Sequence, residues 1–332
     1  MGNISPFNLG TVKNNGVFIV GAARSGTTLL RLLINNHPEI ACLGETQFFH
    51  HNYLQLSSNS EKNISIFSDI FRTESELPNF LYNNELLKYL PKDKTIASYF
   101  NVLLSAYAKK LGKNKWAEKS PSHILRIELI KKLFPDAKII NIKRNPYSSA
   151  ISRFQKLKKK YFNNFSLFFY LKYLKKVDKI VSDFKRENKD SILTVKYEDL
   201  SENPKFVLEK IFSFLDVSDV NIDDEFLSIK SINIPKDKQG LSQTHHKNVS
   251  NKIEVKTYNN AHYFSDFQMY LFQNELAATK HYSEYIDQNA IPRYFFLKLI
   301  LILSYLFFEI PRLKIRRIVN QFKSTVKRIT SQ

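Results

Sequence analysis

The sequence predicts a three-layer α/β fold in which a central parallel sheet is flanked by helices. Three segments carry this prediction, because each contains a short apolar strand followed by a polar turn and a helical pattern; they are residues 16–34, 137–152 and 191–215. Apolar runs rich in Val and Ile, without polar alternation, are typical of parallel strands that are buried on both faces. We therefore expect these strands to share one sheet.

The composition fits one large domain followed by a short tail. The chain has 332 residues, of which 43% are hydrophobic, and this is enough for a substantial core. We expect residues 1–290 to form the main domain and residues 291–332 to form an apolar and then basic helical segment. The single cysteine, Cys42, excludes an intrachain disulfide and favours a reducing compartment. Because the N-terminus lacks the pattern of a signal peptide, the sequence predicts a cytoplasmic protein.

The charge predicts anionic partners. A net charge of +19 suits a multiply charged nucleotide, an acidic glycan, a membrane surface or a nucleic acid. Residues 156–187 are basic and aromatic, a combination that also occurs on nucleic-acid-binding surfaces. A solvated helix face packed by Phe and Tyr is the favoured interpretation, so no nucleic-acid partner is expected.

The first strand runs into a glycine loop. After the apolar run 16–20, Gly21 and Gly26 have the Gly-x-x-x-x-Gly spacing of a P-loop, and a helical pattern follows. Backbone amides and a helix N-terminus in this arrangement surround an anion. A nucleoside-triphosphate loop needs a lysine after its last glycine, but Thr27 stands there. The loop is P-loop-like and predicts an anionic ligand other than a triphosphate; its candidate binding residues are Arg24, Ser25, Gly26, Thr27 and Thr28.

A second strand ends in a cationic turn. The apolar run 137–142 is followed by Arg144, by Pro146 near the start of a helix and by Ser152 two turns later. Lys156 lies on the same helix face as Ser152, at i+4. A guanidinium, a hydroxyl and an ammonium group placed in this way are suited to bind one phosphate.

These two strings, in this order, resemble the sulfotransferases that use 3′-phosphoadenosine 5′-phosphosulfate (PAPS). The resemblance is to the branch that includes tyrosylprotein sulfotransferases and many bacterial sulfotransferases, and it extends over about residues 16–215. It implies that the loop Arg24–Thr28 holds the 5′-phosphosulfate of PAPS. It also implies that Arg144, Ser152 and Lys156 hold the 3′-phosphate, and that no metal is needed.

The resemblance also implies two catalytic residues. Glu45 follows the short apolar run 40–43, and in the related branch this position takes the proton of the acceptor hydroxyl. His50 and His51 are alternative bases, and a capping or salt-bridging acid is the structural alternative for Glu45. Lys119 precedes Pro121, as in the Lys-x-Pro element of the family, whose lysine contacts the sulfuryl group. Its structural alternative is a pair with Glu118 on a solvated face.

Further elements are expected along the chain. Residues 116–121 are expected to introduce a helix capped by Ser120 or Ser122, and residues 191–200 to form a strand. Tyr197, in the string Tyr-Glu-Asp-Leu, lies against the adenine by resemblance. Residues 52–112 are predicted to be a helical insertion on the substrate side, with a helix over 99–111. The polar segment 235–256 is predicted to close over the nucleotide, with Lys247 and Ser250 as candidate contacts.

The C-terminal tail differs in character from the main domain. Residues 294–310 are strongly apolar, and seven Lys and Arg residues without any acid follow in 311–332. The apolar run is at the short limit for a membrane span, and further apolar residues continue at helical spacing beside the cations. We expect peripheral contact with the inner face of a membrane; docking on the main domain or on a partner subunit is the alternative.

Three classes of function remain open at this point. The favoured one is transfer of the sulfuryl group from PAPS to an acceptor hydroxyl, on a glycan or a lipid-linked saccharide. Gln47 stands where the family often has an arginine, which weakens protein tyrosine as the acceptor but leaves it an alternative. The other classes are a P-loop kinase or NTPase, and a non-catalytic basic adaptor at a membrane or nucleic acid.

Overall fold

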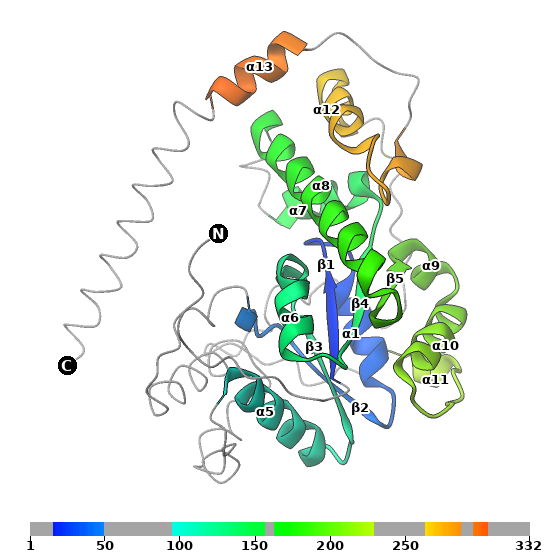
Figure 1. Cartoon of the computed structure of the whole chain (residues 1–332). Helices are drawn as coiled ribbons and strands as arrows, with labels where there is room; N and C mark the ends of the chain where they lie inside the picture. The colour runs from blue at the N-terminus through cyan, green and yellow to red at the C-terminus, as the bar shows by residue number, and fades with distance from the viewer. Residues whose placement is uncertain (1–15, 50–94, 157–162, 229–262, 287–294, 305–332) are drawn as a thin grey trace, which may run out of the picture. The chain divides into compact units, whose positions relative to one another are not determined.

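The computed structural model describes residues 16–49, 95–156, 163–228, 263–286 and 295–304 (Figure 1). Internal contacts divide the chain into two compact units. Unit 1 comprises residues 1–153 and 176–258, and unit 2 comprises residues 154–175 and 259–332.

Unit 1 is built on a parallel sheet of five strands, in the order β2-β3-β1-β4-β5. The strands are β1 (Val17–Gly21), β2 (Ile40–Leu43), β3 (Lys115–Lys119), β4 (Lys138–Lys143) and β5 (Ile192–Lys196). β1 is completely buried, as expected of a strand covered on both faces. The predicted α/β fold with a central parallel sheet is confirmed.

Helices connect the strands and cover the sheet. The longer ones in unit 1 are α1 (Thr27–Asn35), α5 (Ile96–Lys110), α6 (Ile127–Leu133), α9 (Tyr197–Glu202) and α10 (Pro204–Leu215). The short ones are the 3-10 helices η3 (Pro121–Arg126) and η4 (Lys189–Ser191) and the one-turn helix α11 (Asp224–Leu227). The helices α7 (Pro146–Lys156) and α8 (Asn164–Glu187) each have residues in both units.

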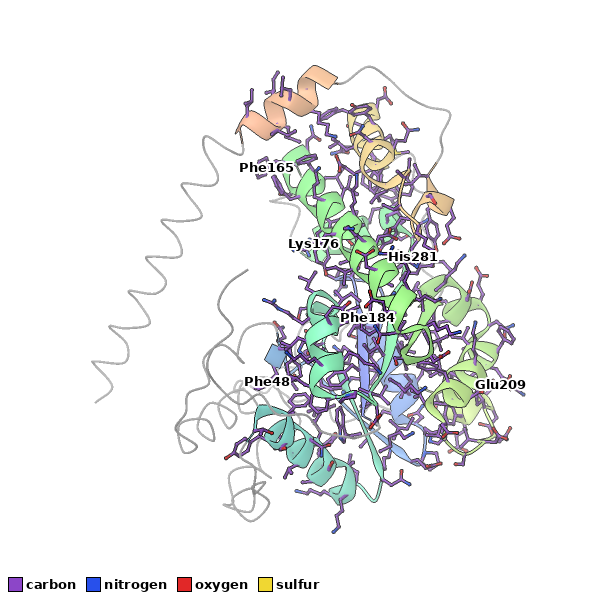
Figure 2. The ribbon with its side chains drawn as sticks, in the orientation of Figure 1. Phe48, Phe165, Lys176, Phe184, Glu209 and His281 are labelled. Carbon is purple, nitrogen blue, oxygen red and sulfur yellow. The ribbon has the colours of Figure 1, made fainter. Side chains whose placement is uncertain are left out.

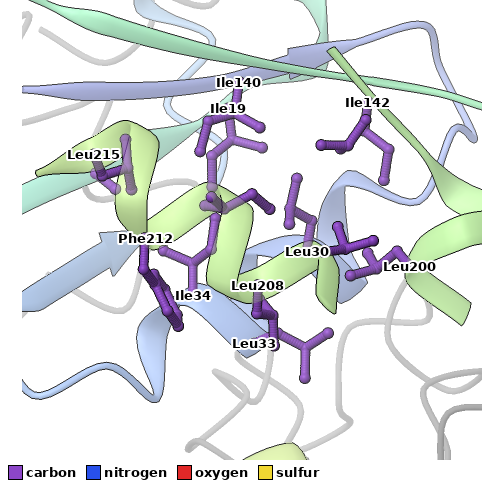
Figure 3. Close-up of a cluster of buried hydrophobic side chains, with 14 of the residues drawn as sticks. Ile19, Leu30, Leu33, Ile34, Ile140, Ile142, Leu200, Leu208, Phe212 and Leu215 are labelled. Carbon is purple, nitrogen blue, oxygen red and sulfur yellow. The ribbon is translucent and has the colours of Figure 1, made fainter. Parts of the chain in front are cut away.

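One face of the sheet packs on aliphatic side chains of α1, α9 and α10 (Figure 3). Successive strand residues point to opposite faces, so Val17 and Ile19 of β1 face this layer together with Ile140 and Ile142 of β4. The helices contribute Leu30, Leu33, Ile34, Leu200, Leu208, Ile211, Phe212 and Leu215. Burial of each such side chain stabilises the fold by about 1.5–3 kcal/mol, so this cluster anchors the helix that follows the glycine loop.

The opposite face packs on aromatic rings. Phe18 of β1 lies 5.4 Å from Trp116 and 5.5 Å from Phe134, measured between ring centroids. Phe100 of α5 lies 5.9 Å from Trp116 and joins the same group, and Phe48 contacts Phe100 with centroids 5.2 Å apart. Figure 2 labels Phe48 and also Phe184 of α8, and both of these side chains are fully buried. Each aromatic pair at such a separation stabilises the fold by about 0.5–1.5 kcal/mol beyond the contribution from burial of the rings.

Three local expectations need correction. Residues 115–119 form β3, inserted between β1 and β2, where no strand was expected. The strand expected over 191–200 ends at Lys196, and Tyr197 begins α9. The helix expected over 99–111 begins at Ile96, because Thr95 caps it by accepting a hydrogen bond from the amide of Ser98. This helix, α5, packs on the sheet; residues 52–94 of the expected insertion lie outside the described residues, and its substrate-side role stays a prediction.

Unit 2 contains α12 (Asp266–Leu276), η6 (Ser283–Tyr285), α13 (Phe295–Ser304) and the first half of α8. A capping box formed by Ser265 and Gln268 begins α12. The carboxylate of Glu275 is buried and forms two ion pairs. Its Oε2 atom lies 3.3 Å from Nζ of Lys172, and its Oε1 atom lies 2.7 Å from Nζ of Lys298. Within the described ranges, no helix is long and apolar enough to cross a membrane. The proposed boundary between the main domain and the tail at residue 290 stays a prediction.

Candidate active site

The carboxyl ends of the strands define the candidate site. Within the sheet, β3 and β2 lie on one side of β1, and β4 and β5 lie on its other side. Ligands of open parallel sheets bind at such a reversal of strand order, beyond the carboxyl ends of the strands. β1 and β4 end level with each other, because Gly21 pairs with Ile142. The two predicted binding motifs therefore leave neighbouring strands at the same edge.

The glycine loop has the conformation expected of an anion site. Gly26, with φ of 102°, caps α1 in the left-handed region, and no side chain caps this helix end in the described structure. The first-turn amides of α1 are thus left for another partner. Ser25 is buried, and among the described residues its hydroxyl has no hydrogen-bond partner. A buried hydroxyl beside uncapped helix amides fits an oxyanion ligand.

Gly26 is required by its surroundings as well as by its backbone. A Cβ atom at this position would lie 2.3 Å from the ring of Tyr197. We expect Gly26→Ala to lower the free energy of unfolding by about 2–4 kcal/mol, through overpacking and left-handed strain. Gly112→Ala is the matched control, because its φ of 72° is also positive but a Cβ there meets nothing within 4 Å. Urea denaturation of both variants is the measurement; equal losses would show that Tyr197 does not crowd the loop.

Arg144 is placed by the turn between β4 and α7. The side chain of Asn145 caps α7, since it accepts hydrogen bonds from the amides of Tyr147 at 2.9 Å and Ser148 at 3.2 Å. Glu198 accepts a hydrogen bond from the amide of Asn145 at 2.9 Å. The guanidinium of Arg144 lies over the ring of Tyr197, 4.0 Å from its centroid.

Arg24 joins the two predicted binding motifs. The Nε atom of Arg24 donates to the hydroxyl of Ser152 at 3.1 Å. The carbonyl oxygen of Arg24 accepts a hydrogen bond from Nη1 of Arg144 at 3.5 Å. Arg24 has a φ of 71°, a left-handed conformation that is uncommon for a residue other than glycine and recurs at functional turns. The loop and the Arg144 turn thus form one continuous cationic site. Lys156 is the last residue of α7, and its side chain lies outside the described part of the chain.

Tyr197 lies between the two motifs. Its ring packs against the Gly26 position on one side and carries the Arg144 guanidinium at the other. The side chain is buried, with 8% exposure. Tyr197 therefore contacts both the loop and Arg144. The contact with adenine predicted for it stays a prediction.

Glu45 and Lys119 form an ion pair at the carboxyl ends of β2 and β3. Oε1 of Glu45 lies 2.7 Å from Nζ of Lys119, which is 2% exposed, whereas the glutamate is 38% exposed. Nε2 of Gln47 donates to the other carboxylate oxygen at 3.4 Å. The expected alternative for Lys119, a pair with Glu118 on a solvated face, is wrong, because both side chains are buried and Glu118 has other partners. A partly exposed carboxylate beside a buried ammonium is suited to accept a proton next to a developing negative charge.

A buried hydrogen-bond network, which no sequence pattern predicted, surrounds Glu118. Oε1 of Glu118 accepts hydrogen bonds from the amide and the hydroxyl of Thr46, at 3.0 and 2.8 Å, and from the hydroxyl of Ser120 at 2.5 Å. Ser120 in turn accepts from the amide of Gln47 at 2.8 Å. Ser120 precedes η3 as expected, but its hydroxyl caps no amide of that helix. The network holds the backbone on the C-terminal side of Glu45.

His123 completes this network. Its Nδ1 atom lies 3.0 Å from Oε2 of Glu118, and its Nε2 atom accepts a hydrogen bond from the amide of Phe49 at 3.1 Å. These partners assign the neutral tautomer with the proton on Nδ1. Burial alone would raise the pKa of Glu118, but His123 and the hydrogen bonds from Ser120 and Thr46 outweigh it and lower that pKa. The glutamate is therefore ionised in the folded protein.

The family is decided by a match over most of the folded domain. A family model described as "Sulfotransferase family" matches residues 16–221, which include Arg24, Glu45, Lys119 and Arg144. The chain belongs to this sulfotransferase family. The comparison with curated proteins finds no match.

Solved sulfotransferase structures resemble the chain in part. The chain is similar to the sulfotransferase domain of the olefin synthase of Synechococcus PCC 7002, at 26% identity and a TM-score of 0.47, with 67% of this chain and 78% of that chain covered. It is also similar to mouse sulfotransferase SULT7A1 complexed with PAP, at 17% identity and a TM-score of 0.44, with coverage of 82% and 88%. Because these likenesses are partial, the assignment to the sulfotransferases rests on the family match.

The sulfotransferase assignment confirms the enzyme class predicted from the two motifs. The roles of individual residues stay predictions, but their geometry is now defined around one edge of the sheet. In the part of the chain that the structure describes, no group of three or more His, Cys, Asp or Glu side chains is arranged to hold a metal. His50, His51 and the segment 235–256 lie outside the described residues.

Proposed function

We propose that this sulfotransferase uses PAPS as its donor and transfers the sulfuryl group to a hydroxyl of a saccharide. The observation that supports the donor is the continuity of the two binding motifs through Arg24, which contacts both Ser152 and Arg144. A nucleotide with negative groups at its 5′ and 3′ positions suits this arrangement, because such groups would meet arginines and loop amides of the same site.

The proposed reaction follows from the placement of the charged side chains. Glu45 accepts the proton of the acceptor hydroxyl while the hydroxyl oxygen forms a bond to sulfur. The bond between sulfur and the 5′-phosphate oxygen breaks, and its electrons stay on the departing 3′-phosphoadenosine 5′-phosphate. Lys119, Arg24 and the loop amides stabilise the negative charge on the sulfuryl and leaving oxygens. The products are the sulfated acceptor, the nucleotide and a proton on Glu45, which solvent removes because Glu45 is partly exposed.

The choice of acceptor rests on the neighbours of Glu45. Gln47 places a neutral amide 3.4 Å from the carboxylate, where an arginine would place a positive charge. A neutral hydrogen-bonding group suits a polyhydroxylated acceptor such as a glycan or a lipid-linked saccharide. Protein tyrosine is the second candidate. We also propose that the reaction takes place in the cytoplasm, in keeping with the lone, buried Cys42.

Binding of the donor distinguishes this proposal from a kinase or NTPase. We expect the protein to bind 3′-phosphoadenosine 5′-phosphate more tightly than AMP or ATP. Arg144→Ala removes charge-assisted hydrogen bonds of about 1.5–3 kcal/mol and should weaken binding of the first nucleotide about 10- to 150-fold. Because the lost contact is with the 3′-phosphate, binding of AMP should change little. Isothermal titration calorimetry with the three nucleotides measures both effects.

Lys210→Ala is the control for this experiment, because it removes the same charge from an exposed position on α10. It should leave all three affinities unchanged. Tight binding of ATP without regard to a 3′-phosphate would overturn the proposed donor. If Arg144→Ala and Lys210→Ala weakened nucleotide binding equally, the result would favour the non-catalytic basic adaptor, because its binding depends only on total charge.

A further inference from the structure

The helix α13 has one side that is held within unit 2. Nζ of Lys298 lies 2.7 Å from Oε1 of the buried Glu275, and it also contacts the side chain of Asn274. The same ammonium lies 5.8 Å from the ring centroid of Phe168. An ion pair with a buried carboxylate fixes which side of α13 faces α12.

The opposite side of α13 is apolar and exposed. Residues of a helix are rotated by about 100° from one to the next. On this basis the centre of the arc covered by Leu297, Leu299, Ile300 and Leu303 lies opposite Lys298. These are four of the seven exposed large hydrophobic residues of the described structure, and Ile300 is 59% exposed. An apolar cluster of this kind marks an interaction surface.

The sequence beyond α13 indicates the partner. Seven Lys and Arg residues and no acid follow within 311–332. Exposed leucines and isoleucine that are followed in the sequence by a cationic segment have the chemistry of a peripheral membrane contact, in which apolar side chains enter the lipid boundary and cations bind anionic headgroups. A second copy of this chain, with a net charge of +19, would place like charges against each other.

We propose that the exposed side of α13 docks on an anionic lipid surface. The ion pair between Lys298 and Glu275 holds the helix on unit 2, and the four apolar side chains face the lipid. The cations of 311–332 add an electrostatic attraction that depends on the lipid charge and on salt. This proposal concerns where the enzyme acts and is independent of its donor and acceptor.

The test is co-sedimentation of the full chain with vesicles. Phosphatidylcholine vesicles are compared with vesicles that also contain phosphatidylglycerol. We expect binding to the anionic vesicles alone, and at least a tenfold weaker partition for the double variant Ile300→Asp and Leu303→Asp. The double variant Leu111→Asp and Phe206→Asp is the matched control, since both are exposed hydrophobic residues, 48% and 62% exposed, and the change in net charge is the same. It makes the same kind of change to an apolar surface in unit 1 and should leave the partition nearly unchanged.

Three results would overturn the proposal. The first is equal binding of the wild type and the double variant, and the second is equal binding to neutral and anionic vesicles. The third is a dimer in sedimentation velocity that the double variant abolishes, which would assign the surface to a second copy. Circular dichroism and nucleotide binding of each variant show that the fold is retained, so that a loss of partition reports on α13.

Discussion

Replacing Glu45 by glutamine is expected to lower kcat by about 10²- to 10⁴-fold, the usual contribution of a general base. Glutamine keeps the size of the side chain and its contact with Lys119, but it does not accept a proton. Because the carboxylate is proposed to act on the acceptor, the affinity for 3′-phosphoadenosine 5′-phosphate should stay within about twofold of wild type. The measurement is formation of this nucleotide from PAPS, with the best acceptor of a panel of oligosaccharides and a tyrosine peptide.

Glu209→Gln is the control for this prediction. It makes the same acid-to-amide change at an exposed position of α10 (Figure 2), and kcat should not change. Retention of wild-type kcat by Glu45→Gln would remove Glu45 from the mechanism and make His50 and His51 the leading candidates for the base.

Replacing Glu118 by glutamine is expected to lower the free energy of unfolding by about 1.5–3 kcal/mol, the range for a hydrogen bond to a charged group. The carboxylate is buried, accepts hydrogen bonds from Thr46 and Ser120, and lies 3.0 Å from Nδ1 of His123. The side-chain amide of a glutamine would place its N–H groups against the Nδ1–H group of His123, which is itself a donor. If His123 changed its tautomer to accept from this amide, its Nε2–H would face the amide of Phe49. One buried donor is therefore left without an acceptor in either arrangement.

The effect of Glu118→Gln should depend on pH. The pKa of Glu118 is lowered in the folded protein from its ordinary value of 4.5. The stability that ionised Glu118 contributes is therefore fully present above the pKa of this group in the unfolded chain. It is lost as the pH falls through the lower pKa of Glu118 in the folded protein. The difference between wild type and variant in urea denaturation should be largest near neutral pH and shrink at acid pH. A difference that does not change with pH would show that shape alone, without charge, accounts for the role of Glu118.

Local patterns were enough to predict the parts of the fold in which strand, turn and helix follow each other directly. β1, the glycine loop and α1 form such a unit, and so do β4, the Arg144 turn and α7. Their apolar runs, glycines and proline act within a few residues, so the sequence alone determined the two binding motifs and the order in which they occur.

The tertiary structure decided what these units contact. β3 was not predicted, because three of its five residues (Lys115, Glu118 and Lys119) are charged, whereas a central parallel strand is normally an apolar run. Glu118 is stable there because Thr46, 72 positions away in the chain, supplies donors to its carboxylate. The pair of Glu45 with Lys119 and the contact of Arg24 with Ser152 join residues 74 and 128 positions apart. The sequence by itself determined which groups could bind an anion or move a proton, and only the packing of five strands at one edge brought those groups within reach of each other.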